Sequence, residues 1–322
     1  MSIRQIIPPM AVPGGLIRIE VDGVQDPTGV QVEIGGVKAD LLGASPRVLM
    51  ARIPEEAGNG VLVREKEEAR GELRVGQVVA SDLHPVSNPV VDEFGNVYVT
   101  YSGSRGEKVP FSLFLVDEEG TKQPFLAEIT NPTGLVIGPD RHLYITSRHT
   151  GAIYRSTFDK QVEKYVDGLG LSTGLAFDSG GNLFVGDRSG MIYKVTPSKE
   201  LTVFCELEPS VSAYHLVFGQ GDVLYVTGAT LATQDCIYRI SSEGEVGIFY
   251  KGLGRPQGLA FSPDGHLQVV ASYRGRRGLY TFRDGVPEFT VSGPMFVGLA
   301  YHPLGKLLYL VDNRRLYRID LP

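Results

Sequence analysis

The chain has 322 residues, among them 40 glycines, 20 prolines and no tryptophan, and its formal charge is −6. This length is typical of a small module joined to a larger one. The acidic balance argues against a general nucleic-acid binder, because neutralising phosphates requires a basic surface. No apolar stretch approaches the roughly 20 residues that span a bilayer. Two cysteines, Cys205 and Cys236, are too few for a disulfide framework or a metal cage.

Residues 16–75 alternate apolar and polar side chains between glycines and prolines, as in LIRIEVDG and GVLVREK. A period of two predicts short strands and a small β-sandwich. The segments IIPPMAVPGGLIRIEVDG and VEIGGVKADLLGASPRVLMARIP resemble the TIG (IPT) immunoglobulin-like family, which implies an immunoglobulin-like domain over residues 1–75. The start, MSIRQIIPPM, has no apolar core and no cleavage site, so it predicts no secretory signal and a cytoplasmic location.

After residue 76 one phrase recurs, most clearly as PTGLVIGPDRHLYITSRHTG and STGLAFDSGGNLFVGDRSG. Its six copies place these residues in equivalent slots, 40 to 46 residues apart: Asn88, Gly134, Gly174, His215, Gly258 and Gly298. A period near 40 in an all-β sequence is typical of a propeller blade of four strands. A non-closing β-solenoid would have a similar period. The last copy lacks its fourth strand, however, which favours a six-bladed β-propeller over residues 76–322, closed by a strand from residues 73–83.

The phrases NPTGLVIGPDRHLYITSR and RPQGLAFSPDGHLQVVAS resemble the NHL-repeat and gluconolactonase (regucalcin)-like propellers. In those lactonases a glutamate, an asparagine and an aspartate before inner strands hold a divalent cation such as calcium. The corresponding positions here carry Ser87, Thr133, Thr173, Tyr214, Gln257 and Val297. Because none is a carboxylate, which a hard cation requires, we expect no metal cofactor and no inherited lactonase activity.

Arginine accumulates in the loops that follow the predicted second strands, at Arg105, Arg148, Arg188, Arg274 and Arg314, and Arg255 precedes an inner strand. Guanidinium groups gathered at one end of the channel would bind a carboxylate or phosphate. The alternative is that they pair with Asp187, Asp235, Asp312 or neighbouring carbonyls as structural links between blades. The candidate ligand-binding residues are Thr133, Thr173, Gln257, Asp187, Arg105, Arg148, Arg188, Arg255 and Arg274. Asp187 and Asp312 end their second strands and either reach the rim or cap turns.

His215 occupies a slot in which four other copies have glycine, and Tyr214 precedes it. This pair predicts either a plug of the channel or a general base beside a hydroxyl group. His84 and His149 also fall toward the mouth, whereas His142 and His266 fall at the opposite end.

Three functions stay open. The favoured one is a binding protein whose arginine-rich mouth receives an anionic small molecule or an acidic segment of a partner protein. The second is an enzyme, either a lactonase-type hydrolase with a rebuilt metal site or a metal-free lyase or hydrolase in which His215 moves a proton. The third is a structural subunit of a larger assembly.

Overall fold

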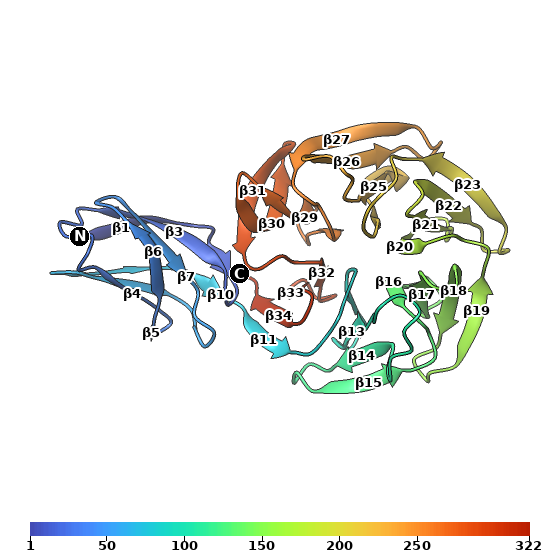
Figure 1. Ribbon diagram of the computed structural model, residues 1–322, viewed down its shortest axis with the longest axis horizontal. Coiled ribbons are helices and arrows are strands. Elements are labelled where there is room, and N and C mark those ends of the chain that lie inside the picture. Colours follow the sequence, from blue (N-terminus) through green and yellow to red (C-terminus); the bar gives the residue numbers. More distant parts are fainter.

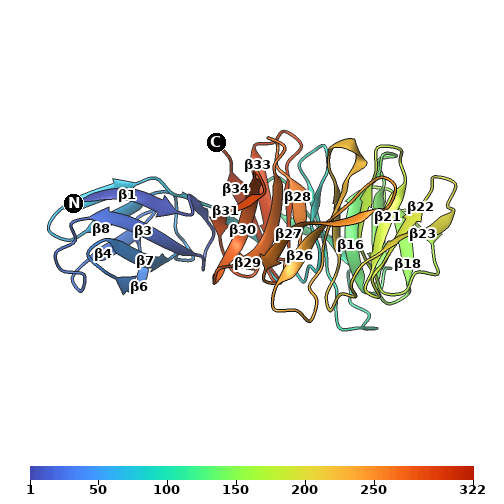
Figure 2. The same cartoon turned by 90° about the horizontal axis from the view of Figure 1, so that it is seen from above.

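The computed structural model describes residues 1–322, and nearly all of its regular structure is β-strand. The exception is the three-residue 3₁₀ turn η1 (Gln220–Asp222). No helix has the length and apolar character that crossing a membrane requires. A ring of sheets and a smaller module lie side by side, and the module meets the rim of the ring (Figures 1 and 2). The all-β class predicted from the alternating pattern is therefore confirmed.

The smaller module contains two four-stranded sheets. The first has the order β1 (Ser2–Ile7), β3 (Leu16–Asp22), β7 (Val48–Arg52) and β6 (Asp40–Ala44). The second has the order β5 (Val37–Lys38), β4 (Gln31–Ile34), β8 (Val61–Arg64) and β9 (Glu68–Gly71). Alternate residues of β3, namely Ile17, Ile19 and Val21, are buried in one cluster with residues of β4, β7 and β8. The period of two in the sequence thus marks the buried face of these strands.

The ring consists of four-stranded antiparallel sheets, the arrangement of a β-propeller (Figure 1). Read from the inner strand outward, the first two sheets are β12 (Val90–Val91), β13 (Val97–Thr100), β14 (Leu113–Val116) and β15 (Lys122–Leu126), and then β16 (Pro132–Ile137), β17 (Leu143–Ser147), β18 (Ala152–Ser156) and β19 (Val162–Val166). The next two are β20 (Ser172–Phe177), β21 (Leu183–Asp187), β22 (Met191–Val195) and β23 (Leu201–Glu206), and then β24 (His215–Phe218), β25 (Leu224–Thr227), β26 (Asp235–Ile240) and β27 (Val246–Leu253). The last two contain β28 (Leu259–Phe261), β29 (Leu267–Tyr273), β30 (Arg276–Arg283) and β31 (Val286–Ser292), and then β32 (Gly298–Tyr301), β33 (Leu307–Val311) and β34 (Leu316–Asp320).

The last sheet of the ring takes its outer strand from an earlier part of the chain. Strand β11 (Gln77–Ala80) pairs antiparallel with β34, so that Gln77 lies opposite Arg318. The segment predicted to complete the final copy therefore does pair with it. Such pairing holds the two ends of the ring together through backbone hydrogen bonds.

The module and the ring are joined by continuous strand pairing. β2 (Met10–Ala11) lies parallel between β31 and β10 (Arg74–Val75), so one sheet runs from the ring into the module. The side chain of Val12 is fully buried in a cluster with ring residues such as Val291 and Ile319. An ion pair of 2.7 Å joins Arg315 to Glu55 across the same junction. Buried apolar contacts and backbone hydrogen bonds thus both cross the boundary.

The recurring glycine slot is explained by the close approach of neighbouring inner strands. A Cβ atom on Gly174 would lie 2.2 Å from the carbonyl oxygen of Tyr214, and one on Gly258 would lie 2.6 Å from the Cα atom of Gly298. Neither glycine has a positive φ, so tight packing around the channel axis rather than backbone conformation requires glycine there.

Candidate functional site

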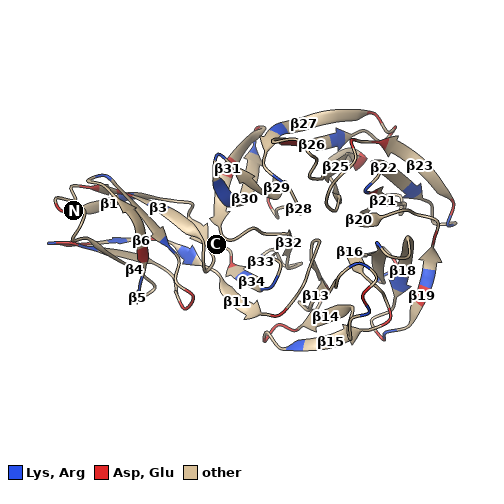
Figure 3. Cartoon of the chain, in the orientation of Figure 1, with Lys and Arg blue, Asp and Glu red and all other residues tan.

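A cavity of about 390 Å³ opens at the end of the ring where the inner strands begin. Strand β16 begins at Pro132 and β17 ends at Ser147, so the start of an inner strand and the loop after its neighbour share this end. Five candidate residues line the cavity together: Thr133, Thr173, Gln257, Arg148 and Arg188. The inner strands carry no charged residue (Figure 3). Charge at the mouth therefore comes from the loops.

Arg148 and Arg188 are held at the mouth by backbone carbonyls. Arg148 donates from Nη2 to the carbonyl of Gly103 at 2.9 Å, and its Nε is buried without a partner. Arg188 donates from Nη2 to the carbonyl of Val211 at 2.7 Å. Burial and the nearby Arg188 and Arg105 guanidinium groups lower the pKa of Arg148. Carbonyls carry no net charge, and neither guanidinium forms an ion pair, although the carboxylate of Asp312 lines the same cavity.

The alternative interpretation holds in part, because Arg148 and Arg188 do bind neighbouring carbonyls, but no aspartate pairs with them. Oδ1 of Asp187 accepts a hydrogen bond from the Ser189 amide, and its Oδ2 is buried without a partner. Asp235 accepts hydrogen bonds from the Thr230 amide of its own loop and from the Arg255 amide of the loop before β28, and Asp312 accepts one from the Arg314 amide. The arginines of the ring that do form ion pairs with carboxylates are different ones, namely Arg141, Arg155, Arg283 and Arg315. Asp187 and Asp312 therefore both cap turns, and Asp312 in addition lines the cavity at the mouth.

The remaining candidate arginines lie outside this cavity. Arg105 is exposed in a loop that the buried Asn131 fixes through hydrogen bonds to Gly103, Ser104 and Gly106. Arg255 lines a neighbouring cavity, and the guanidinium of Arg274 lies 5.1 Å from the ring centroid of Tyr273.

His215 is the first residue of the inner strand β24, does not line the cavity and is 1% exposed. Neither of its ring nitrogens has a hydrogen-bond partner. Burial lowers the pKa of His215 from 6.5 to about 4, and the neighbouring Gln257 side chain opposes this shift. The imidazole is therefore neutral at pH 7. Burial of the imidazole agrees with the predicted plug of the channel. A role as a general base would require a substrate to reach the imidazole from the cavity.

Tyr214 lies in the core, 1% exposed, and does not line the cavity. Its hydroxyl donates to the carbonyl of Glu208, and burial raises the pKa of the phenol. A hydroxyl fixed in this way is not available at the mouth. The structure therefore corrects the prediction that Tyr214 assists His215 there: the side chain packs between sheets with Phe184 and Leu216.

The oxygen donors at the mouth do not fit a divalent cation. The hydroxyl of Thr173 donates to the carbonyl of Gly186 and accepts from the amide of Tyr214. Asp312 lines the cavity, but its oxygens already accept from two backbone amides and from the hydroxyl of Tyr317. No group of three or more His, Cys, Asp or Glu side chains is arranged to hold a metal ion. A hard cation beside two guanidinium groups would also meet electrostatic repulsion.

Sequence reasoning missed the apolar wall of the cavity. The loops that lead into β12 and β32 contribute Pro85, Val86, Pro294, Met295 and Val297. No pattern in the sequences of these two loops, HPVSN and SGPMFVG, marks them as a wall of the site. His84 also lines the cavity, as expected, whereas His149 is exposed and does not line it.

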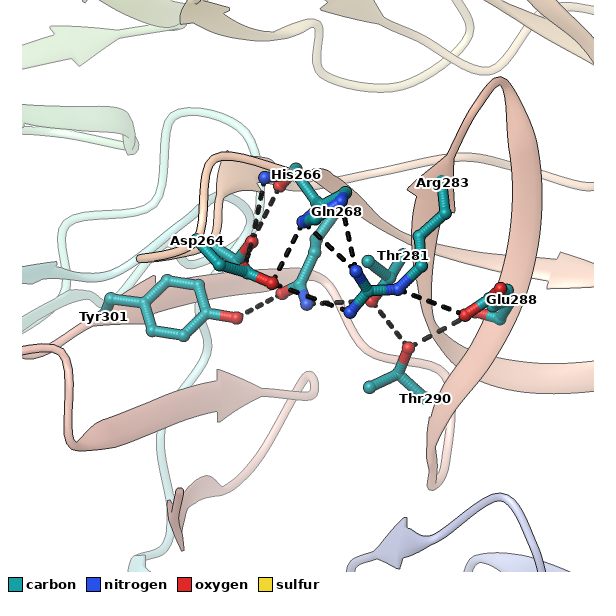
Figure 4. A network of polar contacts seen from close by, with 9 residues as sticks. Asp264, His266, Gln268, Thr281, Arg283, Glu288, Thr290 and Tyr301 are labelled. Carbon is teal, nitrogen blue, oxygen red and sulfur yellow. Dashed lines mark hydrogen bonds and ion pairs between the residues drawn. The ribbon is translucent and has the colours of Figure 1, made fainter. Parts of the chain in front are cut away.

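The opposite end of the ring carries a polar network whose members satisfy one another (Figure 4). His266 pairs with Asp264 at 3.0 Å, and Arg283 pairs with Glu288 at 3.3 Å. The hydroxyl of Tyr301 donates to the side chain of the buried Gln268. The ring of His266 thus has polar partners, whereas the two ring nitrogens of His215 have no hydrogen-bond partner.

Comparison with known proteins supports a propeller fold of the gluconolactonase and virginiamycin B lyase type. No family model matches the chain. A curated gluconolactonase from Zymomonas mobilis is 27% identical over 199 residues, which cover 58% of this chain and 49% of that protein. The chain therefore matches only about half the length of this relative.

Solved structures with this fold include proteins of different activity. A gluconolactonase from Xanthomonas campestris has a TM-score of 0.61 at 16% identity, covering 82% of this chain and 90% of the other. An auxiliary nutrient binding protein from Bacteroides thetaiotaomicron has a TM-score of 0.57 at 12% identity, covering 99% and 97%. Virginiamycin B lyase from Staphylococcus aureus has a TM-score of 0.54 at 14% identity, covering 95% and 100%. These similarities show the fold alone, and a TIG (IPT) domain in residues 1–75 stays a prediction.

Proposed function

We propose that this protein binds a small anionic molecule in the cavity at the mouth of its propeller, without a divalent cation. One observation carries the proposal: Arg148 lines the cavity together with Arg188, its Nε is buried without a partner, and its guanidinium forms no ion pair with a carboxylate. Buried polar groups in proteins nearly always have partners. A carboxylate or phosphate, held by charge-assisted hydrogen bonds, would supply one.

The shape and lining of the cavity support a small organic anion. Its volume of about 390 Å³ lies within the usual range for small-molecule sites. Pro85, Met295 and Val297 add apolar side chains to a lining that also contains Arg148 and Arg188. A ligand with an anionic group and an apolar body would contact both kinds of side chain, whereas a bare inorganic ion would use only the charged ones.

Isothermal titration calorimetry with a panel of carboxylates and organic phosphates tests this proposal. We expect Arg148→Gln to weaken binding by roughly ten- to a hundredfold, because a hydrogen bond to a charged group contributes about 1.5–3 kcal/mol. Arg141→Gln is the matched control, since Arg141 is exposed in the turn between β16 and β17, at the opposite end of the ring, and pairs with Glu93. Equal affinity of both variants and the wild type for every bound anion would overturn the proposal.

A second candidate function is hydrolysis of a lactone, or a lyase reaction, with His215 as the base. Two observations favour it: the 27% identity to a gluconolactonase over 199 residues, and the neutral, unpartnered imidazole of His215. An assay of proton release from sugar lactones, with and without added calcium or zinc, tests the hydrolase. Turnover that is lost in His215→Asn would favour the enzyme, and anion binding without turnover would favour the binding protein.

We also infer that residues 76–322 form six blades and that residues 1–75 form an immunoglobulin-like sandwich. The order of the strands in the ring and the shared core of the two small sheets support this division. Val12 belongs to the core of the ring, however, so we propose that the module is fixed to the propeller as a rigid arm rather than joined by a flexible linker.

A further inference from the structure

A second cavity of about 330 Å³ adjoins the first at the same end of the ring. It is lined by Arg255, Arg277, Ala271 and Phe296, among others, and it shares Met295 with the mouth cavity. Met295 is 43% exposed and lines both cavities, so an unbranched side chain with several rotatable bonds borders the two spaces.

The second cavity is basic and has no acidic side chain in its lining. Arg274, Arg276 and Arg277 lie at the tip of the hairpin between β29 and β30, which reaches this end of the ring. None of these arginines, nor Arg255, takes part in an ion pair, whereas Arg283 of the same hairpin pairs with Asp264 and Glu288 at the other end. In a protein with a formal charge of −6, such a group of like charges without ion pairs attracts an anion.

The floor between the two arginine groups is apolar. Phe296 is 3% exposed and packs against Tyr317, with the ring centroids 6.0 Å apart. Pro294 and Met295 precede it and face the mouth cavity. A molecule that reaches from one cavity to the other therefore crosses apolar side chains and meets guanidinium groups at both ends.

We propose that the ligand carries two anionic groups separated by an apolar spacer, one bound at Arg148 and Arg188 and the other at Arg255 and Arg277, with the spacer over Met295. This inference rests on the proposed function, because it assumes that the mouth cavity binds an anion. Its chemical class is a dianion with charges at both ends, such as an α,ω-dicarboxylate. A second tethered contact strengthens binding when the spacer matches the span between the sites.

Titration calorimetry with α,ω-dicarboxylates from succinate to dodecanedioate, each compared with the monocarboxylate of equal chain length, tests the inference. For one chain length we expect the dicarboxylate to bind at least about tenfold more tightly than its monocarboxylate. Arg277→Gln should remove this advantage and leave the monocarboxylate affinity unchanged. Arg148→Gln should weaken both ligands, and Arg141→Gln should change neither.

The outcomes separate the two proposals. Monocarboxylates that bind and lose affinity in Arg148→Gln would support the mouth site. If dicarboxylates of every length then bind no more tightly than the matching monocarboxylates, the proposal of a dianionic ligand is wrong. If no anion binds, both proposals are wrong. Arg277 is exposed and makes no ion pair, so its replacement leaves the fold intact, which circular dichroism of the variant checks.

Discussion

The buried imidazole of His215 predicts a specific loss of stability in acid. Burial lowers its pKa to about 4 in the folded protein, whereas the unfolded chain has the ordinary value of 6.5. Between these pH values the unfolded state binds the proton and the folded state does not, so the free energy of unfolding falls as the pH falls. The difference of about 2.5 pKa units corresponds to about 3 kcal/mol, lost between pH 6.5 and pH 4.

Urea denaturation of the wild type and of His215→Leu from pH 7.5 to pH 4 measures this effect. Other titrating groups act on both proteins, so the difference between their free energies of unfolding isolates His215. Leucine also removes two buried nitrogens that have no partner, so we expect the variant to be at least as stable as the wild type at pH 7. Its advantage should grow by about 3 kcal/mol toward pH 4. A difference that stays constant across this range would refute the reasoning.

Three further predictions concern packing. Gly174→Ala should lower the free energy of unfolding by about 1–3 kcal/mol, because its Cβ would meet the next inner strand at 2.2 Å, while Gly247→Ala, 3.6 Å from its nearest neighbour, should be nearly neutral in the same denaturation assay. Val12→Ala should cost about 2 kcal/mol by emptying part of the core at the junction, which calorimetry would record as a lower melting temperature; an unchanged value would argue against a rigid junction. Burial raises the pKa of Cys205 to about 11, so iodoacetamide at pH 8 should modify it roughly a hundredfold more slowly than a free thiol, and fast modification of the native protein would contradict its burial.

Much of the candidate site could be predicted from the repeat. Once the copies are aligned, the residues before inner strands and after second strands must lie at one end of the ring, and Thr133, Thr173, Gln257, Arg148 and Arg188 do line one cavity there. The positions of Arg255 and Arg274 were predicted less well, because β29 and β30 are longer than the corresponding strands of the other copies and Arg255 lines a separate cavity. Arg277 and Met295 carried no signal in the alignment.

The sequence alone determined the strands, their period and the end of the ring at which charge gathers, since the alternation of side chains and the spacing of copies are local properties of a chain. Only the tertiary structure decided which polar groups form hydrogen bonds with one another. The phenol of Tyr214 reaches a carbonyl, the aspartates cap their own turns, and the imidazole of His215 remains unpartnered. These outcomes depend on atoms contributed by neighbouring sheets, and the repeat does not encode the distances between them.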